Sequence, residues 1–407
     1  MEPSEFDPDQ APGEVITDEG YDAFNPEPLP PEIDLSSEII DKLSEADRAI
    51  GELSGIGRTI ENPNMLIQPF MRKEAVLSSR IEGTQADLSD VYALEAAGKD
   101  SGAIHEDTQE VYNYLKALQV GLDKLNETDQ QIDLELIREL HRILLDGVRG
   151  ENKNPGEFRT SQNYIGGPGA EVESARYVPP PPQHAEFSIQ QLIRFIRQND
   201  SFPALIQLGL IHYQFETIHP FVDGNGRIGR LLITLLICER NILPDPFLYI
   251  SSYFNRHRRE YIDRMFGVST QGEWEEWLLF FLQGVIEQAE EAFIRANEMR
   301  ELKEEYRVRY QDSQSQSLLT LVYGLFNQPV ITVNKAAEMA DITYQAANNN
   351  VKKLMDDGVL EEITGRKRNR FFQATEIYDI IRKPLEELDN SMEPSVNRRQ
   401  STLGEYN

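Results

Sequence analysis

The chain has 407 residues, of which 69 are acidic and 40 are basic, so its formal net charge is −29, and 40% of its residues are hydrophobic. This length and this hydrophobic content are typical of two or three globular domains with their own cores. A surface this acidic repels phosphate, which excludes a protein that wraps nucleic acid over much of its surface. It does not exclude a small basic module that binds DNA.

The cysteine content and the length of the apolar runs favour a cytoplasmic protein without a membrane-spanning segment. Cys238 is the only cysteine, which excludes a disulfide framework and a cysteine-based zinc site and favours a reducing, cytoplasmic environment. The first residues include no basic stretch of the kind that opens a signal peptide. The longest apolar run, Leu231 to Cys238 with one threonine, is far below the roughly 20 residues needed to cross a bilayer. We therefore expect no membrane partner.

Composition and periodicity divide the chain into six predicted segments. Residues 1–41 contain thirteen acidic residues, no basic residue and seven prolines, which is typical of a disordered acidic tail. The predicted segments are a partly disordered, proline-rich acidic tail over 1–40, an N-terminal helical region over 41–130, a helical core over 131–310, a linker over 311–317, a small second domain over 318–385 and a C-terminal tail over 386–407.

The hydrophobic pattern predicts a mainly α fold. Apolar residues recur with helical spacing over 132–144 and again over 189–196, and a charge-rich helix is expected from Gly272 to about Tyr310. The exception is the segment from Pro155 to His184, where glycine, asparagine and serine surround Tyr164 and the chain ends in four prolines. That segment predicts a short β-hairpin flap followed by a polyproline exit.

One segment has the residues for phosphate chemistry. It reads His219-Pro-Phe-Val-Asp223-Gly-Asn-Gly-Arg-Ile-Gly-Arg230 and precedes an apolar run. Pro220 ends a first helix, and the Gly224-Asn225-Gly226 turn can direct successive N–H groups inward as an anion nest at the start of a second helix. Arg227 and Arg230 share one face of that helix's first turn, where their positive charge opposes the macrodipole unless an anion lies beside them.

Two side chains next to the nest are candidates for the chemistry. Asp223 can hold Mg²⁺ while phosphates supply further oxygen ligands. His219, fixed by the proline that follows it, can take a proton from an incoming nucleophile as a neutral imidazole. Two other interpretations stay open: a turn with a solvated arginine face, and a metal face built from His212, Glu216 and His219 at i, i+4 and i+7.

The whole segment resembles the active-site motif of the Fic family, His-Pro-Phe-x-Asp/Glu-Gly-Asn-Gly-Arg-x-x-Arg, at every defining position. The resemblance implies a helical Fic core over about residues 40 to 300 and transfer of AMP from ATP to a hydroxyl side chain of a target protein. It implies that His219 is the general base and that Asp223 binds Mg²⁺. The implied nucleotide-binding residues are Gly224, Asn225, Gly226, Arg227, Ile228, Gly229 and Arg230, the last on the γ-phosphate.

A second motif lies far upstream. Ser78, Glu82 and Gly83 match the family's inhibitory motif, Ser/Thr-x-x-x-Glu-Gly/Asn. The resemblance implies that Glu82 pairs with Arg230 and takes the guanidinium fork that would otherwise hold the γ-phosphate. From these residues alone, a helix end with Gly83 as its cap is an equally good interpretation.

Two further assignments follow from the resemblance. The segment around Tyr164 to Gly167 resembles the family's flap, which implies that a target protein docks there as an added β-strand; an ordinary exposed hairpin is the alternative. Asn255 lies where family members often place groups near the adenine and ribose, so it is a candidate nucleotide-binding residue.

The C-terminal part predicts three short helices, over 318–326, 333–339 and 343–355, followed by a β-ribbon with Arg366, Lys367, Arg368 and Arg370. This pattern resembles a winged helix-turn-helix. A DNA-binding role would place Gln345, Asn348, Asn349 and Lys352 of the third helix in the major groove. A winged helix used for protein contacts or dimerisation is the alternative.

The function expected from the sequence is therefore that of a protein adenylyltransferase that uses ATP and Mg²⁺ and is inhibited in cis by Glu82. One alternative is an enzyme that uses another nucleotide or removes AMP from a modified protein, with Glu82 orienting water. Another is a DNA-binding regulator whose core senses ATP. Self-modification and a homodimer are open.

Overall fold

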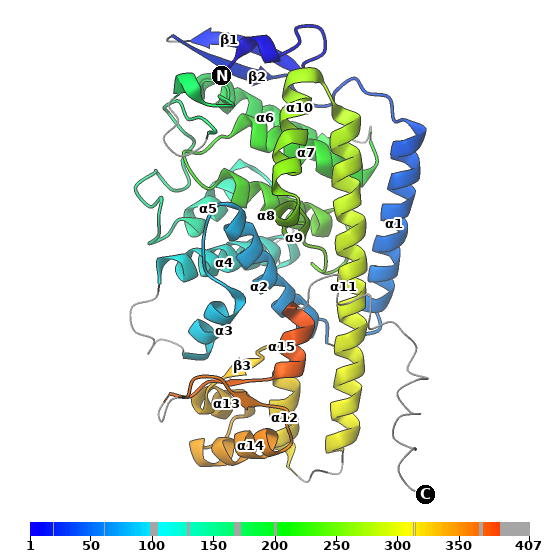
Figure 1. The fold of residues 1–407 in the computed structure, drawn as a ribbon, viewed down its shortest axis with the longest axis vertical. Coiled ribbons are helices and arrows are strands. Elements are labelled where there is room, and N and C mark those ends of the chain that lie inside the picture. Colours follow the sequence, from blue (N-terminus) through cyan, green and yellow to red (C-terminus); the bar gives the residue numbers. More distant parts are fainter. Residues whose placement is uncertain are drawn as a thin grey trace, which may run out of the picture.

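The computed structural model describes residues 1–18, 20–60, 62–97, 105–127, 131–166, 172–198, 202–311, 313, 315–365 and 369–382. These residues form a predominantly helical protein, as the hydrophobic pattern predicted (Figure 1). The helix α11 (Trp274–Tyr310) runs along most of the long axis with α1 (Ser37–Gly57) packed beside it. A two-stranded hairpin lies at one end of the molecule and the C-terminal module at the other.

The helices between α1 and α11 carry the candidate site. They are α2 (Asn64–Ile81), α3 (Leu88–Ala97), α4 (Glu106–Glu127), α5 (Leu134–Leu144), α6 (Pro182–Gln198), α7 (Ala204–Ile218), α8 (Asn225–Glu239), α9 (Ser251–Arg256) and α10 (Arg258–Gln271). None of the described helices is long and apolar enough to cross a membrane.

Local sequence explains where these helices begin and which face they bury. The side chain of Asp133 accepts a hydrogen bond from the Leu136 amide at the start of α5, and Ser36 does the same for α1, so each satisfies an otherwise unpaired amide. The apolar stripe of α5 is buried, and so is the predicted stripe of α6. Both stripes and the long helix α11 are confirmed.

The core centres on α7 and α8, whose side chains are buried on nearly every face. Trp277 of α11 packs against this centre and donates its indole N–H to the Gly209 carbonyl at 3.0 Å. Gly209 permits that approach, because a β-carbon there would lie 3.0 Å from Leu278. The pair α7–α8 is therefore a rigid base for the loop between them.

The prediction of a partly disordered tail over 1–40 is wrong for much of that segment. Residues 3–5 form a short 3₁₀ helix, and β1 (Gly13–Asp18) pairs antiparallel with β2 (Tyr21–Pro26). Phe6 and Phe24 stack with ring centroids 5.1 Å apart in a second core that includes Tyr177. Two buried aromatic rings outweigh the acidic composition, because each removes a large apolar area from water.

The flap differs from the predicted β-hairpin. Among its described residues the only strand-like contact is an isolated bridge between Ile165 and Tyr177, and Gly167 lies outside the described residues together with 168–171. The return arm meets β2 instead, where the Phe24 amide donates to the Val178 carbonyl at 2.9 Å. The prolines from Pro179 onward have no N–H to extend a ladder.

The C-terminal module contains three helices where the sequence predicted them, α12 (Gln316–Gly324), α13 (Val333–Ala340) and α14 (Tyr344–Asp356), and a fourth, α15 (Thr375–Arg382). Its short strands β3 (Val330–Ile331), β4 (Glu361–Glu362) and β5 (Phe372–Gln373) form an antiparallel sheet in the order β3-β5-β4. Residues 366–368 of the predicted wing and the predicted tail over 386–407 lie outside the described residues. The winged-helix assignment and the six domain boundaries stay predictions.

The packing of Phe24 gives a test of the N-terminal correction. We expect Phe24→Ala to weaken the attachment of the hairpin by about 3–5 kcal/mol, because it empties a fully buried aromatic site. Hydrogen exchange over residues 13–26 should accelerate, while the same substitution at Phe187, which is 57% exposed, should have little effect. Unchanged slow exchange over 13–26 in Phe24→Ala would contradict the packing described above.

Candidate active site

The loop between α7 and α8 is sharply turned at His219. The helix α7 ends at Ile218, and His219 takes a left-handed conformation with φ of 50° and ψ of 60°. A non-glycine residue in this region is strained, and such strain persists only where the surroundings hold it. Gly224, with φ of 81°, makes the second turn and begins α8 at Asn225.

Hydrogen bonding fixes which nitrogen of His219 can act as a base. Its Nδ1 lies 3.1 Å from the Glu216 carbonyl oxygen, which can only accept, so Nδ1 carries the proton and Nε2 keeps its lone pair. Burial lowers the pKa of His219 to about 4. The imidazole is therefore neutral at pH 7 and able to accept a proton.

Three polar side chains hold the loop backbone. Asn225 Oδ1 accepts from the Phe221 amide and Asn225 Nδ2 donates to the Phe221 carbonyl, both at 2.8 Å. Arg159 Nε donates to the His219 carbonyl at 2.8 Å, and Asn163 Nδ2 donates to Phe221 at 2.8 Å. The side chain of Asn225 thus supports the loop, and only its backbone amide remains for a ligand.

A buried histidine that the sequence analysis missed also supports the loop. His141 of α5 has Nε2 2.8 Å from the Asp223 carbonyl, accepts at Nδ1 from the Gly156 amide at 2.8 Å, and stacks on Phe221 with ring centroids 3.7 Å apart. Burial lowers the pKa of His141 to about 4, so it stays neutral. In the sequence, the one indication of this role is that a histidine occurs on the predicted apolar face of α5, four residues after Ile137.

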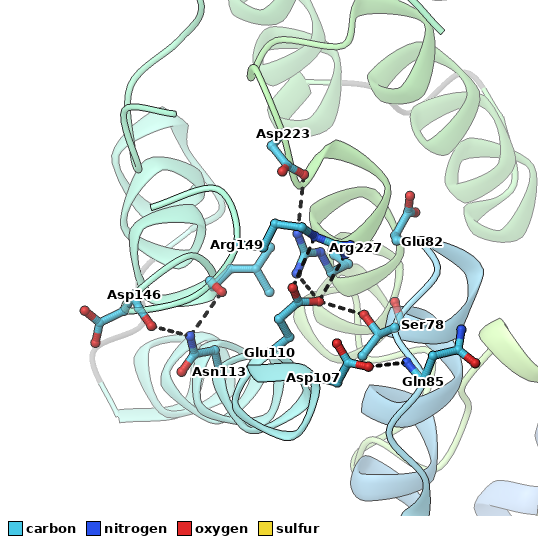
Figure 2. Close-up of polar contacts among 12 residues, drawn as sticks. Ser78, Glu82, Gln85, Asp107, Glu110, Asn113, Asp146, Arg149, Asp223 and Arg227 are labelled. Atoms are coloured by element: carbon cyan, nitrogen blue, oxygen red, sulfur yellow. Dashed lines mark hydrogen bonds and ion pairs between the residues drawn. The ribbon is translucent and has the colours of Figure 1, made fainter. Parts of the chain in front are cut away.

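Arg227, the first arginine of the motif, is buried, and two of its nitrogen atoms make no hydrogen bond to the described residues. Arg227 is 1% exposed, and its Nη1 lies 3.7 Å from Glu110 while its Nη2 lies 3.4 Å from Asp223 (Figure 2). Among the described residues, neither Nε nor Nη1 of Arg227 has a hydrogen-bond partner. Buried cations are costly unless hydrogen-bonded, so these donors suit an anionic ligand at the start of α8.

The second arginine, Arg230, is hydrogen-bonded to two residues of the inhibitory motif. Arg230 donates from Nε to Ser78 Oγ at 2.9 Å, and from Nη2 to the Ser78 carbonyl at 2.9 Å and to Glu82 Oε1 at 2.7 Å. Burial raises the pKa of Glu82, but the charge and hydrogen bond of Arg230 outweigh it and leave the pKa below its ordinary value. The contact that the inhibitory motif implied is therefore present, between an ionised carboxylate and a buried guanidinium.

Glu82 also lies over the nest. A β-carbon on Gly226 would come within 2.2 Å of Glu82 Oε1, so only glycine admits the carboxylate so close to the first turn of α8. Glu82 reaches this place because α2 ends at Ile81 and Gly83 turns the chain with φ of 100°. In this structure the negative charge at the N-terminus of α8 is the chain's own carboxylate.

A cavity of about 200 Å³ opens beside this carboxylate. It brings together His219, Gly226, Arg230 and Glu82, and its apolar wall includes Phe266. The other residues lining it are Ile81, Ile165, Arg176, Tyr177, Glu216, Thr217, Arg258, Tyr261, Ile262, Met265 and Ser269. Among the described residues near Asn255, Arg258 lines this cavity, and the assignment of Asn255 to the nucleotide stays a prediction.

The structure does not form the alternative metal face. His212 Nε2 lies 2.7 Å from the Tyr261 hydroxyl, and its ring stacks on Phe254 and Trp277. Within the described part of the chain, no group of three or more His, Cys, Asp or Glu side chains could hold a metal ion. His212 is therefore a packed core residue.

Glu216 is a carboxyl group without a charge partner of its own. Gly229 lets it lie against α8, since a β-carbon there would come within 2.2 Å of Glu216 Oε1, and this oxygen has no hydrogen-bond partner among the described residues. Burial raises the pKa of Glu216 to about 8; Arg230 opposes the rise and Glu82 adds to it. Glu216 is therefore protonated at pH 7 in the folded protein.

The raised pKa of Glu216 predicts a pH dependence of stability. Between pH 4.5 and 8 the folded state keeps a proton that the unfolded state releases, so the free energy of unfolding falls as pH rises, by at most about 1.4 kcal/mol per pH unit. We expect Glu216→Gln to flatten this slope in denaturant titrations, and Glu135→Gln, at an exposed position of α5, to preserve it. An unchanged slope in Glu216→Gln would contradict the assignment.

Comparison with protein-family models identifies two consecutive regions. Residues 40–123 match the Fic/DOC family N-terminal region, and residues 131–237 match the Fic/DOC family itself. The two matches contain the contact partners described above, with Glu82 and Glu110 in the first and Arg227 and Arg230 in the second.

Known proteins give the same picture. The chain is 35% identical over 119 residues to protein adenylyltransferase Fic of Drosophila grimshawi, covering 28% of this chain and 22% of that protein. It is 32% identical over 141 residues to the Drosophila melanogaster protein of the same name, covering 33% of this chain and 26% of that protein. The chain thus spans about a quarter of the length of these curated relatives.

Two solved structures share the fold at a TM-score of 0.51 and 19% identity. One is a Fic family protein from Desulfovibrio desulfuricans G20; the match covers 85% of this chain and 98% of the chain in that structure. The other is a fragment of Fic-1 from C. elegans; the match covers 65% of this chain and 74% of the chain in that structure. These two structures show a shared fold, and the two family-model matches over 40–123 and 131–237, which contain the intact motif from His219 to Arg230, show that this chain belongs to the Fic/DOC family.

Proposed function

We propose that this protein is an adenylyltransferase that transfers AMP from ATP to a hydroxyl side chain of a target protein and is restrained by Glu82. The observation that carries the proposal is the buried guanidinium of Arg230, paired at 2.7 Å with a carboxylate of the same chain at the mouth of a glycine nest. The curated relatives named protein adenylyltransferase Fic support the same chemistry.

The N-terminus of α8 is the proposed phosphate site. The amides of its first turn and the unpaired Nε and Nη1 of Arg227 would bind the α- and β-phosphates. Arg230 would bind the γ-phosphate once Glu82 leaves it. Catalysis then consists largely of holding the triphosphate and neutralising charge that develops in the transition state.

His219 is the proposed general base. Its Nε2 lone pair would accept the proton of the target hydroxyl as that oxygen attacks the α-phosphorus. The new O–P bond forms while the bond to the bridging oxygen of the β-phosphate breaks, and pyrophosphate leaves. The hydrogen bonds from Arg159 and Asn163 hold the loop backbone, and the Glu216 carbonyl orients the imidazole for this step.

Asp223 fits a magnesium ligand. Its side chain is 36% exposed, and the described residues provide no all-protein cage around it. Mg²⁺ commonly takes one or two carboxylates and completes its shell with water and substrate phosphates, so a single accessible carboxylate beside the nest suffices. The ion would neutralise charge on the phosphates.

The flap is the proposed target-docking surface. Tyr164 and Ile165 are 43% and 38% exposed, although both are large and hydrophobic. Ile165 also lines the cavity that contains His219. An extended target segment lying along Tyr164–Ile165 would therefore bring its hydroxyl toward the base.

The restraint by Glu82 gives the main prediction. We expect Glu82→Gly to incorporate at least ten times more AMP than wild type, because it frees Arg230 for the γ-phosphate, and ten-fold corresponds to only about 1.4 kcal/mol. The assay incubates each protein with labelled ATP and Mg²⁺ and locates AMP on the protein itself by mass spectrometry. The matched control Glu82→Gly/His219→Ala should show none.

The same assay separates the proposal from its rivals. A Glu82→Gly protein that binds ATP but stays unmodified would refute both the transfer and the restraint. Incorporation from another labelled nucleotide in place of ATP would assign a different donor. If wild type strips AMP from the modified Glu82→Gly protein and Glu82→Gln does not, the ionised Glu82 orients water for the reverse reaction.

A second candidate function concerns the C-terminal module. The outward face of α14 exposes Gln345, Asn349 and Lys352, with Asn348 partly exposed beside them, which is the polar face that a recognition helix would present to the major groove. For this function we expect the full chain to bind a random duplex pool at low ionic strength and to lose affinity steeply as salt rises. No salt-sensitive binding would exclude it and favour a protein-contact role.

A further inference from the structure

We propose that Glu110 of α4 is a positioning residue that couples the turn behind Glu82 to the phosphate-binding arginine Arg227; this inference rests on the proposed function. Its carboxylate is 1% exposed and accepts a hydrogen bond from Thr84 Oγ1 at 2.6 Å. It also lies 3.7 Å from Arg227 Nη1 and 3.3 Å from Arg149 Nε (Figure 2). One buried carboxylate thus contacts Arg227 of the active-site motif and Thr84, the residue directly after the inhibitory motif.

On the Arg227 side, Glu110 acts as counter-ion and guide. It lies next to Nη1, and Asp223 lies 3.4 Å from Nη2, so the guanidinium plane is held between two carboxylates. This orientation leaves Nε of Arg227 without a partner among the described residues. Without Glu110, the buried guanidinium would keep only the partly exposed Asp223 as a counter-ion and would be freer to rotate, which weakens any phosphate contact made through it.

On the Glu82 side, two residues in the first two turns of α4 hold the chain just after Glu82. Thr84 donates to Glu110, and the next amide, Gln85 N–H, donates to Asp107 Oδ2 at 2.9 Å. The Thr84 amide in turn donates to the Ser79 carbonyl at 3.2 Å. Because Thr84 is 1% exposed and only two residues beyond Glu82, its hydroxyl limits how far the turn can swing from Arg230.

The two halves of the coupling can be separated by substitution. Thr84→Val has nearly the same shape but no hydroxyl, so it frees the turn while Glu110 still faces Arg227. Thr84→Ser keeps the hydroxyl and should restore the anchor. Glu110→Gln keeps an oxygen that can accept from Thr84 but removes the negative charge opposite Arg227.

The turn is tested in the otherwise unaltered chain. We expect Thr84→Val to raise AMP incorporation at least three-fold and to accelerate hydrogen exchange over residues 79–87, whereas Thr84→Ser matches wild type in both. In the Glu82→Gly background, Thr84→Val should add nothing, because the restraint is already absent. Equal exchange and equal incorporation in Thr84→Val and Thr84→Ser would overturn the anchoring half.

The arginine is tested by binding, so that the result does not depend on turnover. In a His219→Ala background, we expect Glu110→Gln to weaken ADP binding about ten-fold by calorimetry, and Thr84→Val to change it less than two-fold. A Glu110→Gln protein that melts as wild type and binds ADP equally well would overturn the positioning half. If Glu82→Gly transfers no AMP, the proposed function fails, yet the ADP affinity and the exchange over 79–87 still decide the coupling.

Discussion

The ion pair between Glu82 and Arg230 is the contact on which the organisation of this site depends. It joins the end of α2 to the second turn of α8 across 148 residues of sequence. A helix N-terminus attracts negative charge, and two arginines in the first two turns of α8 strengthen this attraction. The carboxylate of Glu82 supplies this negative charge, and it lies so close to Gly226 that a side chain there would collide with it. Under the proposed function, a phosphate that approaches Arg230 would compete with the carboxylate of Glu82, whose pKa the charge of Arg230 lowers.

Contacts from the surrounding helices hold the loop and the arginines of the site in place. His219 holds a strained left-handed conformation because Arg159 binds its carbonyl and α7 ends directly before it. Asp223 is fixed through its carbonyl by His141, and Arg227 through the buried Glu110. These contacts hold the backbone and the arginines while the cavity beside Glu82 stays open. A ligand can thus replace one carboxylate without rebuilding the loop, which is the arrangement that preorganised catalysis requires.

The parts that could be predicted from sequence are those encoded within a few residues. Pro220 and the glycines predicted the turn before α8, and helical periodicity predicted α5, α6 and α11. His141 could not be assigned, because its partner at Asp223 is 82 residues away. The N-terminal segment was misjudged from its acidic composition, since the decisive contact is the packing of Phe24 on Tyr177, more than 150 residues later. Long-range packing overrides a compositional prediction wherever a few buried rings find a partner.

The net charge of −29 says little about the ligand, because the site is a small basic cluster within an acidic protein. The central claim is that Glu82 holds the group that would bind the γ-phosphate. Calorimetric affinities for ATP and ADP, measured with wild type and Glu82→Gly, test it most directly. The account predicts nearly equal affinities in wild type, where Arg230 is occupied, and a clear preference for ATP over ADP in Glu82→Gly. The same ATP-to-ADP ratio in both proteins would contradict it.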